Sequence, residues 1–279
     1  MPKNIFMCAS DLAVITGDNP YKDIEEIILK YWKKHYKNNY LNCVENIEKS
    51  NKQIKKEETH YETINRISKE NNINIQGELS KCLKTNTIDD LNKNKNIIFE
   101  KTLNKLNENQ KKEFTDSINR ATNTNFGIKF ENKGVEMYES LTNNKVIFDR
   151  KYHKKELFHI EYDDDIDVWS LGGKIDGIST NITNNTTKIL EIKNRVNKLF
   201  KCVRNYEKVQ CYAYMFLLDI PVIDLAETLK SNQSLMNINT INFDDDYWDN
   251  HIETKIEVFV DDFYNFLEDS ERQYRLLVN

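Results

Sequence analysis

The residues best suited to chemistry lie in one short segment, residues 172–195, which reads GGKIDGISTNITNNTTKILEIKNR. Glu191 and Lys193 are two positions apart, so on a strand they project from the same face, while the apolar residues beside them project from the other. A polar turn rich in Asn and Thr separates this strand from an earlier strand-like stretch, which predicts a hairpin. Pairing across that hairpin would bring Asp176 beside Glu191.

Two adjacent carboxylates and an ammonium on an apolar sheet suit metal-dependent hydrolysis. The carboxylates repel each other and are costly to desolvate unless a cation neutralises them. Mg²⁺ does this with few protein carboxylates and several waters. The bound ion can polarise a phosphodiester and lower the pKa of a water, while a nearby lysine orients that water or stabilises developing charge. Asp176, Glu191 and Lys193 are therefore predicted to centre the active site of a metal-dependent DNA nuclease. The alternative is a structural Glu–Lys pair beside an unrelated aspartate.

Two residues outside the hairpin are candidates for the same site. Gln210 falls on the inner face of a predicted helix over 206–218, where burying an unpaired amide would cost about 1–3 kcal/mol. It therefore needs a polar partner, either in the active site or in an ordinary core hydrogen bond. Glu131 lies in the first turn of a predicted helix over 130–141. It could supply a third carboxylate, or it could simply be favoured there by the helix dipole.

A local basic patch follows the Glu-x-Lys strand, although the whole chain has a formal net charge of −5. For nucleic-acid binding, the field near the phosphates matters more than the summed charge. The patch is predicted to hold DNA beside the site, and its residues are Arg195, Lys198, Lys201, Arg204 and Lys208.

The elements around the hairpin indicate how these residues are positioned. Asp23 and Glu26 are placed for a capping box at the start of an amphipathic helix. Helices followed by a strand cluster, and then by helix, strand and helix, predict an α/β (α+β) fold with a central mixed β-sheet flanked by helices. The other predicted helices cover 130–141, 206–218 and 256–277, and the predicted strands cover 145–148, 156–162, 168–178, 188–193 and 222–226.

No linker rich in Gly, Pro or Ser divides the chain, so residues 1–279 are predicted to form a single domain. About 1–44 would hold an N-terminal motif and helix. About 45–125 would form a helical insertion with a break at 71–75, and about 126–279 would form the catalytic core.

Other features of the composition exclude some classes of protein. Five cysteines lie far apart, which argues against a zinc or iron–sulfur site and favours free thiols. No apolar run approaches the roughly 20 residues that cross a bilayer, so a soluble, intracellular protein is expected. The acidic triplets 163–165 and 244–246 lack the Gly and the final Glu of a Ca²⁺-binding EF-hand loop and are predicted to be polar turns.

Four pieces of the sequence, in order, resemble the PD-(D/E)XK nuclease superfamily, in particular the YqaJ-like viral recombinase group that includes lambda exonuclease. They are AS…GxNPY, a Gly-x3-Glu with a following Tyr, GKIDG…EIK, and a QxYAYM helix with a later LAE. Together they span nearly the whole chain and leave only the middle helical stretch unmatched. Outside the hairpin, the matching residues are Ala9, Ser10, Gly17, Asn19, Pro20, Tyr21, Gly127, Glu131, Tyr138, Gln210, Tyr212, Met215, Leu225 and Glu227.

The resemblance implies a restriction-endonuclease-like core and roles for some of the matching positions. Ser10 would lie near the DNA phosphates. In the family an Arg commonly precedes this serine, and here only Lys3 is available, which leaves 5′-phosphate recognition open. The implied metal-site residues are Asp176, Glu191, the carbonyl of Ile192 and Glu131, with Lys193 as the catalytic lysine and Gln210 as a site-organising residue.

The activity that the resemblance implies is 5′–3′ exonucleolysis of linear double-stranded DNA with Mg²⁺, or with Mn²⁺ in its place. It would give single strands for recombination, repair or replication. Implied partners are DNA with free ends, a single-strand annealing protein and further copies of the chain. Abundant Asn, Lys and Ile, together with this family type, suggest a large DNA virus or similar AT-rich genome, and hence the host cytoplasm or a viral factory. Two alternatives stay open: an endonuclease of the same superfamily, and a non-catalytic DNA-binding recombination module.

Overall fold

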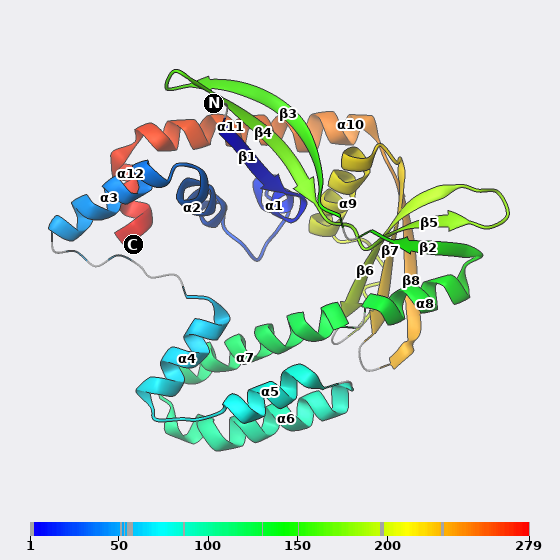
Figure 1. Cartoon of the computed structure of the whole chain (residues 1–279), viewed down its shortest axis with the longest axis horizontal. Helices are drawn as coiled ribbons and strands as arrows, with labels where there is room; N and C mark the ends of the chain where they lie inside the picture. The colour runs from blue at the N-terminus through cyan, green and yellow to red at the C-terminus, as the bar shows by residue number, and fades with distance from the viewer. Residues whose placement is uncertain are drawn as a thin grey trace.

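Two β-sheets and the helices that cover them make up the computed structural model (Figure 1). The structure describes residues 3–50, 52, 54, 58–85, 87–129, 131–149, 151–195, 198–229 and 232–278. One sheet has three strands in the order β1-β4-β3, and the other has five in the order β2-β5-β6-β7-β8. The strands are β1 (Lys3–Cys8), β2 (Asn144–Phe148), β3 (His153–Tyr162), β4 (Asp165–Gly173), β5 (Gly177–Asn181), β6 (Thr187–Arg195), β7 (Val222–Leu229) and β8 (Asn232–Asn242).

The predicted fold class is confirmed. In the five-stranded sheet β6 and β7 run parallel, whereas the other neighbours run antiparallel, so the sheet is mixed. Helix α2 starts with the predicted capping box of Asp23 and Glu26. The helices among the described residues are α1 (Ala9–Ile15), α2 (Ile24–His35), α3 (Lys37–Lys49), α4 (His60–Glu70), α5 (Gln76–Lys84), α6 (Ile88–Thr102), α7 (Glu108–Lys129), α8 (Glu131–Leu141), α9 (Asn205–Leu218), α10 (Asp245–Tyr247), α11 (Thr254–Glu268) and α12 (Ser270–Val278), with a 3-10 turn at Leu103–Lys105 and a π-helix at Trp248–Glu253.

The five-stranded sheet lies between α8 and α9, and this fixes the two faces of β6. Leu190 and Ile192 pack with Val135 and Tyr138 of α8 on one face, as their alternation predicts. Ile189, on the other face, belongs to the main core cluster, which also contains apolar residues of α9. Glu191 and Lys193 therefore share the α9 face of the sheet.

Gly134 lets α8 approach β6 closely. A Cβ at this position would lie 2.8 Å from Cγ2 of Ile192, so any side chain would force the helix or the strand to shift. A glycine in an element often marks such a close approach. The first turns of α8, which begin at Glu131, are thereby held against the strand that carries Glu191 and Lys193.

The predicted strand over 168–178 is wrong in one respect, because two strands in different sheets cover it. β4 ends at Gly173 and pairs with β1 and β3, whereas β5 starts at Gly177 and pairs with β2 and β6. Residues 174–176 carry the chain from one sheet to the other. The apolar pattern continues through this crossing, since Ile175 is buried as well. Asp176 consequently lies just before a strand, not within one.

Other elements differ from the prediction for local reasons. β1 and β8 were not predicted, and the many Asn residues of β8 hide its alternation. The predicted helix over 256–277 is divided at Asp269 into α11 and α12. The break predicted at 71–75 is confirmed, since α4 ends at Glu70 and Asn72 adopts a φ of 51° before α5 begins.

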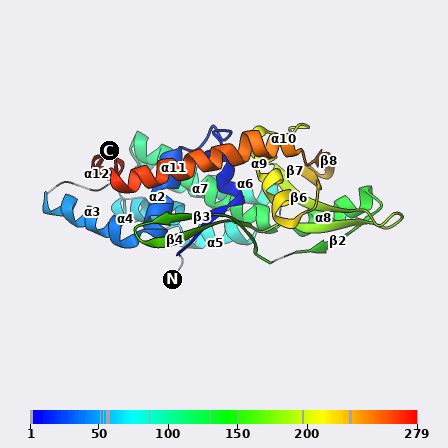
Figure 2. The ribbon, with the colours of Figure 1, turned by 90° about the horizontal axis from the view of Figure 1, so that it is seen from above.

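The predicted insertion over about 45–125 is helical, and α4 to α7 enclose an apolar cluster of their own. Helix α7 leads from this group of helices to α8 (Figure 1). Figure 2 shows α11 and the β3–β4 pair on opposite sides of α2, and the ring of Tyr31 contacts both Phe259 and Trp169 there. The cluster within the insertion includes Ile64, Ile67, Leu91, Ile98, Phe114 and Ile118.

Three further expectations can be compared with the described residues. None of their helices combines the length and apolarity needed to cross a membrane. All five cysteines are free thiols, as predicted. The acidic stretch after β3 forms the predicted turn, in which Asp163 and Asp164 have φ angles of 53° and 61°.

Candidate metal-dependent active site

Asp176 lies beside β6, where the hairpin prediction puts it. Gly177 pairs with Leu190 across β5 and β6, so Asp176 comes one residue before the pairing, level with Glu191. Its Oδ2 accepts a 2.6 Å hydrogen bond from the backbone N–H of Ile192. This bond fixes the orientation of the carboxylate at the open end of the hairpin.

Lys193 lies in a chain of hydrogen bonds that links β6 to α9. Its Nζ donates to Oε1 of Glu191 at 2.7 Å and to Oε1 of Gln210 at 3.0 Å. Gln210 in turn donates from Nε2 to the hydroxyl of Tyr214 at 2.8 Å. The polar partners that Gln210 requires are therefore the ammonium of Lys193 and this phenol. The side chains of Glu191 and Lys193 are 7% and 23% exposed, so the lysine end of the chain reaches solvent.

Asp176 lies in an excess of negative charge. Burial raises the pKa of Asp176 to about 8, and the carboxylates of Glu191 and Glu131 act in the same direction. The N–H of Ile192 and the ammonium of Lys193 oppose this rise without cancelling it. One ammonium does not balance three acidic groups in a partly buried site, so the metal-free protein retains a proton there.

The same electrostatic effect locates Glu131 close to the hairpin. Glu131 is the first residue of α8, which packs against β6 through Gly134. Its side chain is partly buried. Among the described residues, no three His, Cys, Asp or Glu side chains come close enough together to form a metal-binding group. A direct bond from Glu131 to the metal therefore stays a prediction.

The remaining donors fit a hard divalent cation. In the hydrogen bonds among the described residues, Asp176 uses only Oδ2 and Glu191 only Oε1, so each carboxylate keeps a second oxygen for a metal. Ile192 lies between the two site residues of β6 and could add its carbonyl oxygen. Mg²⁺ is commonly held by one or two carboxylates together with waters, so a third carboxylate is not required. A cation here would also remove the repulsion that raises the pKa of Asp176.

Helix α1 borders the site and carries Ser10. A Cβ at Gly173 would lie 3.2 Å from Cβ of Ala9 and 2.9 Å from Cε1 of Tyr214. The start of α1, the end of β4 and α9 therefore meet at this glycine. Ser10 follows Ala9 and is exposed, so its hydroxyl is accessible from solvent near this junction.

Lys3 does not stand in for the arginine that commonly precedes the family's serine. It lies at the start of β1, whereas Ser10 comes after the end of β1, and the strand from Lys3 to Cys8 is roughly 16 Å long at about 3.3 Å per residue. Its ammonium is 3.6 Å from Asp167 and 3.7 Å from the centre of the Tyr36 ring. The sequence could not reveal this, because the distance depends on β1 being extended.

Arg195 differs from the rest of the predicted basic patch. Its guanidinium donates to Glu207 through Nη1 and Nη2 at 2.6 and 2.9 Å, and to Glu227 through Nε at 2.7 Å. Both carboxylates are buried, and the arginine side chain is only 12% exposed. The structure thus gives Arg195 an internal ion-pair role in place of the predicted DNA contact.

The other basic residues of the patch lie at the surface. Lys198, Lys201 and Arg204 are exposed. The guanidinium of Arg204 lies over the ring of Phe200 at 4.3 Å. Lys208 lies instead over the ring of Tyr247 at 3.6 Å, on a different side of α9. Contact of these residues with DNA stays a prediction.

The sequence interpretation gave no role to Glu207 or to the tyrosines near the site. Glu207 is in the first turn of α9, where a buried carboxylate and one favoured by the helix dipole have the same sequence signature. Tyr206 precedes Gln210 by four residues, and that spacing puts both on one face of the helix, as the sequence predicts. The Tyr206 ring lies 6.0 Å, centre to centre, from the ring of Tyr21.

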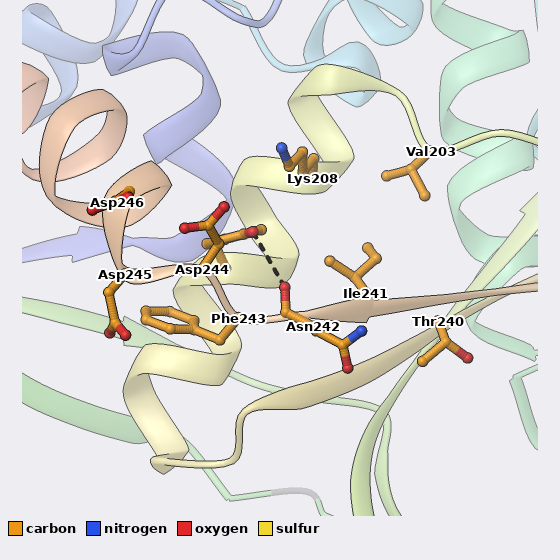
Figure 3. Close-up of a pocket in the computed structure, with 10 residues that line it drawn as sticks. Val203, Lys208, Thr240, Ile241, Asn242, Phe243, Asp244, Asp245 and Asp246 are labelled. Carbon is orange, nitrogen blue, oxygen red and sulfur yellow. Dashed lines mark hydrogen bonds between the residues drawn. The ribbon is translucent and has the colours of Figure 1, made fainter.

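A cavity of about 800 Å³ lies on another face of α9 (Figure 3). Lys208 and Tyr212 line it, and each is two positions from Gln210, so they project away from the Lys193 side of the helix. The acidic triplet 244–246 lies at its edge. Asp244 caps α10, so this triplet begins a helix and is not the predicted polar turn. The cavity is therefore separate from the site around Lys193.

Comparisons with known proteins give a limited result. No protein-family model matches the sequence, and no curated protein sequence matches it. Among solved structures, the chain is similar to an alkaline exonuclease, LHK-Exo, from Laribacter hongkongensis, with a TM-score of 0.37 and 14% identity, covering 69% of this chain and 88% of that one. For LHK-Exo in complex with dAMP the TM-score is 0.38 and the identity 13%, with coverage of 69% and 88%. Likeness at this level does not establish a family, so the function must rest on the geometry of the site.

Proposed function

We propose that this protein is a metal-dependent nuclease that hydrolyses phosphodiester bonds in DNA. The observation that carries the proposal is the excess of carboxylates over cations around Asp176, next to a lysine fixed between Glu191 and Gln210. A structural Glu–Lys pair would need only Glu191 and Lys193. It would not need Asp176 to be oriented by the N–H of Ile192 at a position where its charge is unfavourable.

Mg²⁺ is the proposed cofactor, and Mn²⁺ is expected to replace it. Asp176, Glu191 and the carbonyl of Ile192 would hold the ion, with Glu131 adding a carboxylate directly or through a water. When bound, the ion would polarise the phosphodiester and lower the pKa of the attacking water.

The side chains of the site would position the substrate and stabilise charge. Burial lowers the pKa of Lys193, but the charge and hydrogen bond of Glu191, with smaller contributions from Cys211 and Glu207, together raise it by more, so the net shift is upward. Lys193 is therefore an ammonium, and its role would be to donate a hydrogen bond to a phosphate oxygen or to the attacking water. Gln210, itself bonded to Tyr214, would keep that ammonium in place.

Exonucleolytic, 5′–3′ action on linear double-stranded DNA is the finer part of the proposal. The motif resemblance supports it, and so does the exposed position of Ser10 where α1 meets the C-terminal end of β4. Because Lys3 lies elsewhere, a 5′-phosphate would have to be recognised by Ser10 and the exposed basic residues. The single strands produced would serve recombination, repair or replication, with an annealing protein as partner. The second candidate is an endonuclease of the same superfamily, since the same metal site would serve both.

The test is degradation of linear duplex DNA by the purified protein with Mg²⁺ or Mn²⁺. We expect EDTA to stop the reaction and Lys193→Ala to slow it by at least about 10²–10³-fold, the size typical of losing one charge-stabilising donor. Lys188→Ala is the matched control, because Lys188 pairs with Asp224 on the opposite face of the same strand. Equal rates for the wild type and Lys193→Ala would contradict the proposal. Closed circles, and linear DNA with 5′-phosphate or 5′-hydroxyl ends, distinguish exonuclease from endonuclease.

A further inference from the structure

An exposed pair of aromatic rings, Tyr21 and Tyr206, lies close to the candidate active site. Tyr21 belongs to the loop between α1 and α2, and its side chain is 78% exposed. Tyr206 is in the first turn of α9 and is partly buried. The two rings meet edge to face, with an interplanar angle of 78°. We call Tyr21 and Tyr206 the tyrosine pair.

The helix places Tyr206 one turn from Gln210, the residue that holds the catalytic lysine. Tyr206 and Gln210 are four residues apart and so lie on one face of α9, separated by about 6 Å along the axis. Gln210 is the residue that contacts Lys193, at 3.0 Å. Tyr206 is also near enough to Arg195, two residues beyond Lys193 on β6, to be influenced by its charge. A nucleotide next to one whose phosphate is at Lys193 would therefore lie within reach of the pair.

The loop that carries Tyr21 is held in place by specific hydrogen bonds. Asn19 accepts a 3.0 Å bond from the N–H of Tyr21 through its side chain, and its own N–H donates to the carbonyl of Ala13 at 2.8 Å. Asp18 accepts from Thr16 at 2.6 Å and is 2.8 Å from Nε2 of His251. The exposed ring is thus presented by an ordered loop, and a ligand that stacks on it loses little further conformational freedom.

Exposed basic residues lie close to the tyrosine pair in the sequence. Arg204 is two residues before Tyr206, and Lys22 directly follows Tyr21; both are exposed. Lys198 and Lys201 are exposed on the segment that leads into α9. Aromatic rings for stacking bases, together with cations for phosphates, form the chemistry by which proteins bind single-stranded nucleic acid. Within a duplex, each base face is already covered by its neighbours, so such rings can stack only on a terminal or unpaired base.

We propose that Tyr21 and Tyr206 form a stacking site for an unpaired nucleobase next to the scissile phosphodiester. The substrate at the point of cleavage is then a frayed end or a single strand, not an intact internal duplex. This inference rests on the proposed function and defines its substrate more narrowly. Tyr21 acts as a positioning residue for the strand and takes no part in the chemical step.

The first experiment measures stacking without cleavage. An oligonucleotide duplex with a two-nucleotide frayed end, carrying 2-aminopurine at the terminal unpaired position, is titrated with Lys193→Ala protein in EDTA. We expect quenching of the 2-aminopurine fluorescence, which Tyr21→Ala added to Lys193→Ala abolishes and Tyr21→Trp retains. Binding should weaken by about 5- to 150-fold on loss of the ring, since stacking one base on an aromatic ring is worth about 1–3 kcal/mol and 1.4 kcal/mol is tenfold. Tyr61→Ala is the control, because Tyr61 is an exposed tyrosine on α4, in the helical insertion.

The second experiment links the effect to the base. Replacing the 2-aminopurine nucleotide by an abasic one should weaken binding of the Lys193→Ala protein by the same factor, and Tyr21→Ala should then add nothing. Unchanged quenching in Tyr21→Ala, or equal affinity for a duplex whose ends are closed by hairpins, would overturn the inference. Failure of the proposed function is distinguishable, because the wild type would then not cleave DNA while the tyrosine-dependent quenching persists. Absence of all oligonucleotide binding would overturn both.

Discussion

Two acidic clusters lie side by side on the α9 face of β6, and their charges are balanced in different ways. In one, the Arg195 guanidinium lies between Glu207 and Glu227, with hydrogen bonds of 2.6 to 2.9 Å to both. In the other, Lys193 supplies the ammonium beside Asp176 and Glu191. That ammonium donates a hydrogen bond to Glu191, whereas Asp176 accepts its hydrogen bond from the backbone N–H of Ile192. The two clusters are two residues apart along the strand, so the sheet provides the same scaffold for both.

The difference separates a structural cluster from one prepared for a ligand. A guanidinium satisfies two carboxylates through its fixed fork of donors, so the Arg195 cluster is complete within the chain. The Asp176 cluster lacks a positive charge, and burial together with this deficit raises the pKa of Asp176 to about 8. The unfavourable electrostatics are therefore concentrated where a metal would relieve them, as is common at functional sites.

The largest expected effect comes from substitution in the Arg195 cluster, whose charges are balanced within the chain. Arg195→Ala should reduce the free energy of unfolding by about 3–5 kcal/mol, because it leaves two buried carboxylates without their cation. Urea unfolding measures this loss in the free energy of unfolding. Arg272→Ala is the matched control, since Arg272 makes a bidentate pair with Asp262 at the surface, and such pairs contribute about 0–1 kcal/mol. Similar losses for the two variants would show that the Arg195 cluster is not the structural one.

The second-largest expected effect is the stabilisation of the protein by a metal ion bound at the Asp176 cluster. Mg²⁺ or Mn²⁺ at about 100 times its dissociation constant should stabilise the wild type by about 2.7 kcal/mol. The gain should vanish in Glu191→Gln. It should persist in Asp245→Asn, which removes charge from the acidic triplet beside the other cavity. Thermal unfolding with and without the ion gives the result, and a loss of the gain in Asp245→Asn alone would move the metal site to that triplet.

The effect of pH on the stability of Asp176→Asn relative to the wild type should be somewhat smaller than the effect of the metal ion. The pKa of Asp176 in the folded protein, about 8, exceeds the roughly 3.9 of an unfolded chain. Below pH 4 the carboxyl is protonated in both states and contributes nothing. As pH rises from 4 to 8 the unfolded state ionises first, so the metal-free wild type loses stability relative to the asparagine variant. We expect the variant's advantage in EDTA to grow by about 2 kcal/mol between pH 5 and pH 6.5, at about 1.4 kcal/mol per pH unit. A constant difference would mean that Asp176 ionises normally.

The smallest effect should come from the exposed basic residues. Arg204→Gln should change the free energy of unfolding by less than about 0.5 kcal/mol. It should nevertheless reduce the slope of log binding constant against log salt by about one unit for duplex DNA. Fluorescence anisotropy between 50 and 200 mM salt would measure the slope. An unchanged slope would remove Arg204 from the DNA-binding surface.

Much of the candidate site could be predicted because it is local. Glu191 and Lys193 share a face through the two-residue period of a strand, and a polar turn of Asn and Thr residues signals the hairpin that aligns them with Asp176. The need of Gln210 for a polar partner follows from the apolar face on which it lies. The division of 168–178 between two sheets could not be predicted, because the apolar pattern of β4 continues through the buried Ile175 into β5.

The hairpin, the capped helix α2 and the grouping of Asp176, Glu191 and Lys193 all follow from spacing along one strand, turn or helix, so they can be inferred from the sequence alone. The balance of charges follows from the tertiary structure instead. Arg195 finds its partners 12 and 32 positions away, and Tyr21 meets Tyr206 across most of the chain. Which cation neutralises which carboxylate depends on distances in space, and these exist only once the sheet and α9 have packed. For that reason Arg195, the basic residue next to the candidate site, forms its ion pairs inside the protein. The Asp176 cluster, whose negative charge Arg195 does not neutralise, is the one proposed to bind metal.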